Sequence, residues 1–149
     1  MKTTLIALLA LGVCLPLGCG KKKSDTQAAP PKGERTKATE TPGMFAAKKA
    51  HEEGRYAEAV RVYTAELATE EAKSGPSWVQ LSYLNNQLGL ALDGAGQYDH
   101  ALENYQKALA IKLKQLGPDH PNVARSYNNI GLVHNAKGEY AKALENYHK

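Results

Sequence analysis

The residues of this chain that could carry metal or nucleophilic chemistry are its histidines and its two cysteines. The histidines lack the close spacing of a metal-binding motif such as His-Glu-x-x-His; they are His51, His100, His120, His134 and His148. Both cysteines, Cys14 and Cys19, lie near the start, so no disulfide, zinc–cysteine site or cysteine nucleophile can form in the rest of the chain. The sequence also has no Gly-rich phosphate loop and no Gly-x-Ser-x-Gly turn. We therefore predict no catalytic residue, no metal site and no cofactor.

The chemistry open to Cys19 is lipidation at the end of a targeting segment. Lys2 precedes an apolar run over residues 5–17, which is too short to span a bilayer and is typical of a secretory signal peptide. The run ends in Gly18-Cys19, which resembles the lipobox of bacterial lipoproteins. That resemblance implies a signal peptide over residues 1–18, cleavage between Gly18 and Cys19, and acyl chains on Cys19 that hold the protein to a membrane. The alternatives are an ordinary secretory signal that happens to contain Cys19, and an uncleaved anchor.

Residues 19–43 form a polar segment with no Leu, Ile, Val or aromatic side chain. Such a segment cannot bury enough apolar surface to offset the entropy of ordering, so we predict a disordered tether. Gly20 follows the cysteine where Asp would favour retention in the inner membrane. The lipoprotein resemblance therefore implies the bacterial cell envelope, on the periplasmic face of the outer membrane. The alternative is a soluble periplasmic or secreted protein.

The formal net charge of +4 is unevenly placed along the chain. Residues 44–149 hold 12 Lys and Arg residues and 12 Asp and Glu residues, whereas the excess lies in Lys2 and in residues 20–43. Binding to nucleic acid requires basic side chains gathered on the folded part of a protein. The charge distribution therefore argues against a nucleic-acid partner.

An internal period of 42 residues organises the chain from Met44 to its end. The motif Gly-x-Tyr-x-x-Ala occurs three times, beginning at Gly54, Gly96 and Gly138. A fixed period of this size indicates a stack of supersecondary units, each of which buries an apolar face against the next. Apolar residues at three- and four-residue steps predict two helices in each unit. The expected units cover about 44–75, 76–117 and 118–149, and the second helix of the last unit is short.

Turn and capping residues predict where the helices begin and end. Gly-Pro pairs at 75–76 and 117–118 should each end a helix. Ser77 should cap the helix that follows the first pair, and Asp119 should take the same place in the third unit; His120 should have a turn or capping role. Small residues should allow paired helices to approach closely, and they are Gly89, Ala101, Gly131 and Ala143.

The repeated residues resemble the tetratricopeptide repeat. In the middle unit the pattern of a Leu-Gly pair, a turn glycine, alanine and an aromatic residue is carried by Leu88, Gly89, Gly96, Tyr98, Ala101 and Tyr105. In the third unit it is carried by Ile130, Gly131, Gly138, Tyr140, Ala143 and Tyr147. The eight additional residues per unit are similar to the longer repeats of kinesin light chains and their bacterial relatives. The resemblance implies an all-α helix-turn-helix solenoid of just under three repeats, and a protein that binds rather than catalyses.

In this family the first helices of successive units line a concave groove that holds peptides from partner proteins. The resemblance therefore implies a protein or peptide partner and a scaffold or adaptor role. The candidate contacts lie on the first helices away from the apolar stripe, and they are Lys48, Asn86, Gln87, Asp93, Asn128, Asn129 and Asn135. Side-chain amides suit this role because one group both donates to and accepts from a peptide backbone. Alternatively, these amides are simply solvated or tie adjacent helices together.

Two further readings bear on the partner. A carboxylate clamp of the kind that grips chaperone C-termini is not supported, because Met44 and Gln87 stand where its lysine and asparagine are expected. The alternative function is structural. In that case the chain docks through its open C-terminal end into a larger envelope assembly, or onto a second copy as a homo-oligomer.

Overall fold

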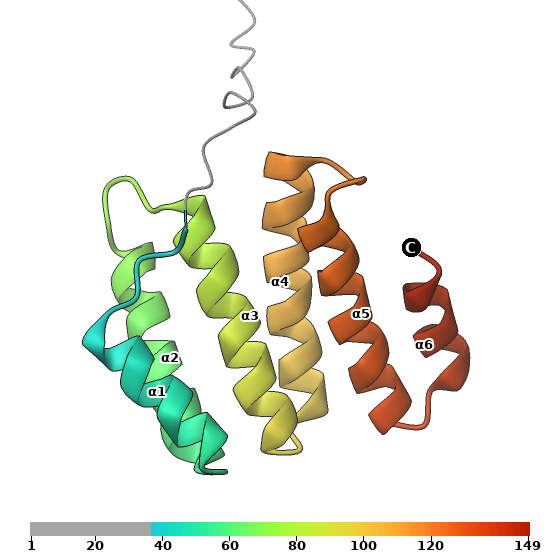
Figure 1. The fold of residues 1–149 in the computed structure, drawn as a ribbon, viewed down its shortest axis with the longest axis horizontal. Coiled ribbons are helices and arrows are strands. Elements are labelled where there is room, and N and C mark those ends of the chain that lie inside the picture. Colours follow the sequence, from blue (N-terminus) through green and yellow to red (C-terminus); the bar gives the residue numbers. More distant parts are fainter. Residues whose placement is uncertain (1–36) are drawn as a thin grey trace, which may run out of the picture. The chain divides into compact units, whose positions relative to one another are not determined.

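The computed structural model describes residues 37–149, and the expected signal peptide, Cys19 and most of the expected tether lie outside this range. The described residues form six α-helices: α1 Pro42–Glu52, α2 Tyr56–Glu71, α3 Trp78–Gly94, α4 Tyr98–Leu116, α5 Pro121–Ala136 and α6 Tyr140–Tyr147. Each helix packs chiefly against its neighbours in sequence, which gives the row of helices in Figure 1. Each predicted unit contains one pair of helices, so the prediction of an all-α solenoid is confirmed. None of the helices within residues 37–149 is long and apolar enough to cross a membrane.

The turn inside each unit is built the same way three times. Gly54, Gly96 and Gly138 follow the first helix of each pair with φ angles of 74°, 73° and 76°. In the first unit, the Gly54 amide donates to the carbonyl of His51 at 3.0 Å, and the Arg55 amide donates to the carbonyl of Ala50 at 2.8 Å. This pair of bonds satisfies the last carbonyls of a helix and needs a left-handed residue, which glycine supplies without steric cost.

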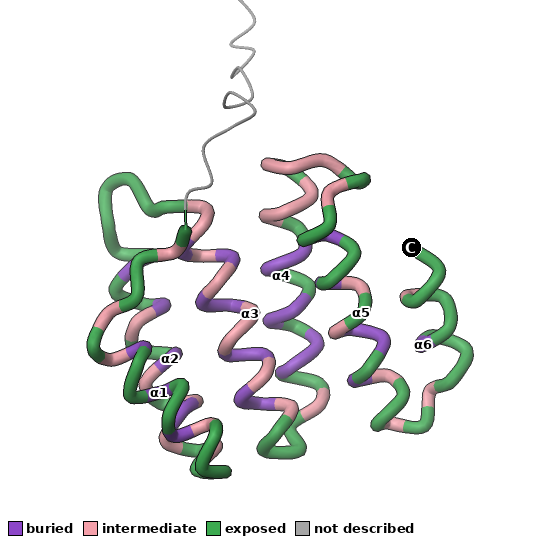
Figure 2. Tube along the Cα trace, in the orientation of Figure 1, coloured by how far each residue is buried: buried purple, intermediate pink, exposed green. Residues whose placement is uncertain are grey.

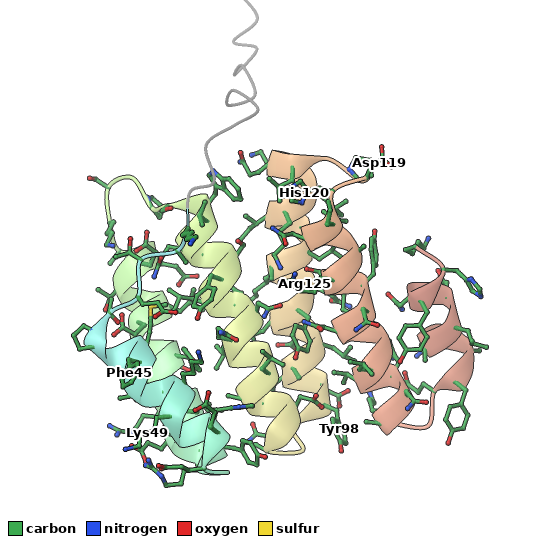
Figure 3. The ribbon with its side chains drawn as sticks, in the orientation of Figure 1. Phe45, Lys49, Tyr98, Asp119, His120 and Arg125 are labelled. Carbon is green, nitrogen blue, oxygen red and sulfur yellow. The ribbon has the colours of Figure 1, made fainter. Side chains whose placement is uncertain are left out.

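The N-terminal caps agree with the sequence analysis at Ser77 and differ in the third unit. The Ser77 hydroxyl accepts from the amide of Gln80, so the predicted cap of α3 is confirmed. In α5 the cap is His120, whose Nδ1 accepts from the amide of Asn122 at 3.0 Å. The prediction for Asp119 was wrong, because Pro121 fills the first helical position and thereby makes its predecessor the cap. Asp119 lies exposed in the preceding turn (Figure 3).

The core is a continuous cluster along the faces where the helices meet, as the buried residues in Figure 2 show. Tyr63 and Tyr105 occupy the same repeat position on α2 and α4, and both are buried. Gly89 faces Tyr105 so closely that a Cβ atom there would lie 2.9 Å from the ring. Gly131 faces Tyr147 in the same way, at 2.5 Å. Small residues at these positions thus let an aromatic ring lie directly on the backbone of the partner helix.

The start of the folded region lies slightly before the expected position. The sequence analysis placed residues up to 43 in a disordered tether, but α1 begins at Pro42. The Thr39 amide donates to Gln80 Oε1, and Gln80 Nε2 donates back to the Thr39 carbonyl, both at 2.9 Å. The Thr41 hydroxyl donates to Glu66 Oε1 at 2.8 Å. These bonds hold residues 39–41 against α2 and α3, so the tether prediction was wrong for this stretch.

Candidate functional site

The period of 42 residues places equivalent residues of α1, α3 and α5 in rows, and we call the surface that they share the α1–α3–α5 face. One row contains Lys48, Leu90 and Leu132. Leu90 is half-buried, whereas Leu132 is 50% exposed, which is high for a leucine. The next helical turn adds a row of His51, Asp93 and Asn135, and the preceding turn adds a row of Met44, Asn86 and Asn128. The face therefore combines the half-buried Leu90 and the exposed Leu132 with amides.

The predicted contact amides divide into two groups. Asn129 Nδ2 donates to Asn86 Oδ1 at 3.1 Å, and this bond joins α5 to α3. Gln87 Nε2 donates to the Tyr83 hydroxyl at 2.9 Å along α3. These three amides are half-buried, and the Asn86–Asn129 bond corresponds to the alternative in which amides tie adjacent helices together. Asn128 and Asn135 are exposed instead, and within residues 37–149 their side chains make no hydrogen bond.

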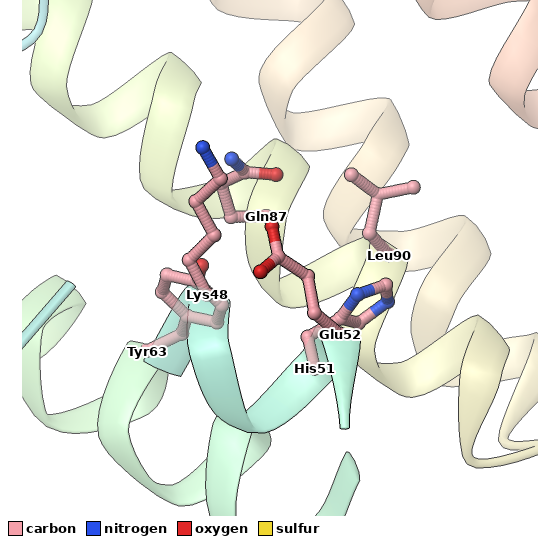
Figure 4. A pocket seen from close by; sticks show the side chains of 6 residues that line it. All are labelled: Lys48, His51, Glu52, Tyr63, Gln87 and Leu90. Carbon is pink, nitrogen blue, oxygen red and sulfur yellow. The ribbon is translucent and has the colours of Figure 1, made fainter. Parts of the chain in front are cut away.

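A pocket opens where α1 and α2 meet α3. It has a volume of about 180 Å³ and is lined by Lys48, His51, Glu52, Tyr63, Gln87 and Leu90 (Figure 4). Burial raises the pKa of Tyr63 to about 12, so its hydroxyl keeps its proton at neutral pH. Lys48 and Gln87 belong to the predicted contact set, whereas the other four lining residues were missed. The repeat offers a signal for one of them, because Leu90 precedes the exposed Leu132 by one period.

Asp93 is the predicted contact residue with the most unusual surroundings. Its side chain is half-buried and has no hydrogen bond or ion pair within residues 37–149. Burial raises the pKa of this carboxyl group, and the nearby His51 partly opposes that rise. The His51 ring also contacts the Tyr56 ring edge-on, with 5.3 Å between the ring centroids. The carboxylate of Asp93 is thus partly desolvated, and within residues 37–149 no lysine or arginine pairs with it.

Lys112 on α4 and Arg125 on α5 form a basic corner where α4 meets α5, and Arg125 belongs to a row of the α1–α3–α5 face. Lys112 is half-buried, and its Nζ donates to the Ser126 hydroxyl at 2.8 Å. Burial and the charge of Arg125 lower the pKa of Lys112 to about 8. Arg125 is exposed and occupies the same row as Tyr83 (Figure 3). Within residues 37–149, no acidic side chain forms an ion pair with either residue.

The basic corner was not predicted, because the candidate contacts were placed on the first helices alone. Lys112 lies on a second helix, on the same side of α4 as Tyr105 and Leu109. The equivalent side of α2 carries Tyr63, which lines the pocket between α1 and α3. One signal was available in the sequence. The residue that precedes Lys112 by one period is Glu70, so the charge at this position reverses between units.

The remaining polar clusters of the described region have structural partners. His134 Nδ1 lies 2.7 Å from Glu139 Oε2, and Glu139 also contacts Lys137 and Lys142. These contacts, led by the hydrogen bond from Lys142, lower the pKa of Glu139 to about 2. Over residues 37–149, no three His, Cys, Asp or Glu side chains converge as metal ligands would.

Comparison with known proteins gives one family and a set of structural neighbours. The tetratricopeptide repeat family matches residues 50–114 and again residues 84–149. Among solved structures, 33 chains match. One is BtubC (BKLC) from P. vanneervenii, with 25% sequence identity and a TM-score of 0.52. The match covers 68% of the present chain and 42% of that protein, so the chain spans about two fifths of its neighbour's length. No curated protein matches the sequence.

Proposed function

Because this chain belongs to the tetratricopeptide repeat family, whose members are protein-interaction scaffolds, we propose that it binds a peptide segment of a protein partner on the α1–α3–α5 face. Leu90 and Leu132 supply apolar contact at the same repeat position. Asn128 and Asn135 are exposed beside them and can pair with a peptide backbone. The 42-residue spacing supports placing these repeats with the longer, kinesin-light-chain-like form.

The observation that carries the proposal is the partly buried charge of Lys112, which has no acidic partner within residues 37–149. A partly buried ammonium group loses hydration, and an opposing charge offsets this loss. Here the nearest charge is Arg125, which has the same sign. The Ser126 hydroxyl takes one of the three N–H donors of Lys112, and Ser126 itself is buried. An acidic side chain of the partner would balance both cations, so the proposed partner segment carries an acidic residue for this corner.

Site-specific photocrosslinking tests the binding face. A photoreactive amino acid replaces Asn128 or Leu132 on the face, or Gln106 on the exposed side of α4 as the matched control. We expect a specific adduct from the two face positions in the native cell, and its loss when Lys112→Met is added. Adducts of equal yield from Gln106, or none from the face positions, would contradict the proposal.

We also propose that Cys19 is lipidated and that the protein is tethered to a membrane of the bacterial envelope, on the periplasmic face of the outer membrane. The support is the Gly18-Cys19 pair at the end of the apolar run. Several acyl chains would hold the protein stably to a bilayer, at about 0.8 kcal/mol per buried methylene. The Cys19→Ser variant should incorporate no labelled fatty acid and should leave the membrane pellet. A wild-type protein that incorporates no label would contradict lipidation.

A second function, assembly through the C-terminal end, is favoured by the outer face of α6. Tyr140 and Leu144 are 65% and 58% exposed, whereas their equivalents Tyr98 and Leu102 on α4 are at least half-buried. A helix that resembles α5 would cover this face. The outer side of α1 is a poor candidate, because Lys49 stands where Val133 is buried in α5. An envelope protein with an aliphatic helix therefore fits better than a second copy arranged head to tail.

A further inference from the structure

We propose that the partner segment lies on the α1–α3–α5 face in one fixed orientation, with an acidic residue at the Lys112–Arg125 corner and a basic residue near Glu52 and Asp93 at the α1–α3 end. The proposal rests on the proposed binding function and adds the second charge and the direction. Two oppositely charged ends of one binding face would exclude segments in which these charges are reversed.

The α1–α3 end of the face carries excess negative charge. Glu52 lines the pocket and Asp93 lies one helical turn beyond Leu90, and within residues 37–149 neither carboxylate is in an ion pair. Lys48 lies four residues before Glu52 on α1, a spacing that often gives an ion pair on a helix, but no such pair forms. Glu52, Asp93 and Lys48 together give this end a formal net charge of −1, with histidine not counted, against +2 at the Lys112–Arg125 corner.

The pocket provides the contacts that a long basic side chain needs. Leu90 offers an aliphatic surface for its methylene groups, and the Glu52 carboxylate, the Tyr63 hydroxyl and the Gln87 amide oxygen are acceptors for its N–H groups. Figure 4 shows these polar groups around the same space. A volume of about 180 Å³ accommodates one such side chain and leaves its charged end beside the solvent.

The two ends are separated by a distance that a short extended peptide can cover. Packed helix axes lie about 10 Å apart at closest, and α3 lies between α1 and α5, so the step from α1 to α5 is roughly 20 Å or more. Arg125 is equivalent to Thr41, which lies 11 residues before Glu52, or roughly 16 Å along the helix axis. The diagonal is therefore on the order of 25 Å, which about eight extended residues would span.

The middle of the face does not fix the direction in which a peptide segment binds. Between the two charged ends lie uncharged side chains, most of them amides and leucines, which are Asn86, Gln87, Leu90, Asn128, Asn129 and Leu132. Amides accept either direction of a peptide backbone, and aliphatic contacts have no polarity. The direction of the segment thus depends on Glu52 and Asp93 at one end and on Lys112 and Arg125 at the other.

Selection of random peptides displayed on phage against the purified full chain tests this proposal. We expect enriched peptides to carry an acidic and a basic residue about eight positions apart. Selection against the Lys112→Met, Arg125→Gln double variant should lose the acidic preference alone. Selection against the Glu52→Gln, Asp93→Asn double variant should lose the basic preference alone. The matched control is the Glu103→Gln, Lys107→Met variant on the exposed side of α4, which should retain both preferences.

One enriched peptide then reports orientation directly. A photoreactive group beside its basic residue should label α1 or α3, and a group beside its acidic residue should label α4 or α5. Each double variant on the face should weaken binding of this peptide by up to about fivefold, as loss of an ion pair near a surface does. Bound peptides without separated charges, or labels on the same helices from both ends, would overturn the orientation while leaving groove binding intact. If no selected peptide binds the α1–α3–α5 face, the proposed binding function itself is wrong.

Discussion

The junctions α2–α3 and α4–α5 place opposite charges at one repeat position, and only one of these charges is balanced. At the first junction, Glu70 is buried, accepts from the Ser77 amide at 2.7 Å and pairs with Lys73. At the second junction, Lys112 bonds to the Ser126 hydroxyl beside Arg125. Glu70 thus completes the turn into α3 and is satisfied within the fold. Lys112 has no ion-pair partner within residues 37–149, and an acidic side chain of the proposed partner would remove this difference between the two junctions.

The largest loss of stability should come from truncation of the buried tyrosine, which occupies the same repeat position on α2 and on α4. Tyr105→Ala should destabilise the protein by roughly 3–5 kcal/mol, because the truncation leaves a cavity against Gly89. Urea unfolding followed by circular dichroism measures this loss. Tyr147→Ala is the matched control at the same repeat position, where the side chain is partly exposed, and it should cost clearly less. Equal losses would show that the two units are equally packed.

The next largest loss of stability should come from substitution of Glu70. Glu70→Leu should cost about 1–3 kcal/mol, because it leaves the Ser77 amide without its acceptor. Glu70→Gln keeps an acceptor oxygen and should cost less. Hydrogen exchange at residues 72–78 should accelerate in the Leu variant, and unchanged exchange there would contradict the role of Glu70 in this turn.

The Glu70 carboxylate should also make the stability of the protein depend on pH. The Lys73 hydrogen bond and the Ser77 amide hold the pKa of Glu70 below its ordinary value of 4.5. Its contribution to stability is therefore present above pH 4.5 and is lost as the pH falls through the lower, folded-state pKa. Wild type should lose more stability than Glu70→Gln in melts taken below pH 4.5. Parallel losses would assign the acid sensitivity to other groups.

Lys112→Met should raise the free energy of unfolding, whereas the substitutions described above lower it. The pKa of Lys112 is about 8 in the folded state against an ordinary 10.5, so its charged form is disfavoured by folding. Removal of the charge should stabilise the protein by roughly 1 kcal/mol at neutral pH, after allowance for solvent screening. Between pH 8 and 10.5 the unfolded state binds more protons, so wild-type stability should rise with pH while the variant stays level. A destabilised Met variant would make Lys112 a structural residue.

The smallest effect on stability should come from the exposed amide. Asn128→Ala should change the free energy of unfolding by less than about 0.5 kcal/mol while it weakens partner binding. Asn129→Ala should cost more, about 1 kcal/mol, because it breaks the bond to Asn86. Thermal melts beside a binding titration compare the two. Unchanged binding by both variants would favour assembly through α6 over binding on the α1–α3–α5 face.

The sequence predicted the helices well because their signals are local. A glycine with positive φ, a capping hydroxyl and an apolar period of 3.6 act within one or two turns, and the 42-residue spacing repeats them. The turn or capping role predicted for His120 is confirmed, whereas the cap predicted at Asp119 was wrong because Pro121 shifts the helix start by one residue. Lys48 and Gln87 line the pocket and Asp93 is half-buried, whereas their role as partner contacts stays a prediction. Lys112 and the hydroxyl of Tyr63 were missed because they lie on second helices, and their contacts with α5 and with the pocket depend on how neighbouring helices pack.

The pairing of Thr39 with Gln80 has a mechanical consequence. A pulling force applied at residue 37 does not act on the first turn of α1 alone, because the two bonds between Thr39 and Gln80 pass part of the load directly to α3. Thr41 and Glu66 pass another part to α2. Parallel bonds that are strained together resist a steady pull better than bonds that open one after another. Tension on the N-terminal segment is thereby shared among three helices before any of them unwinds.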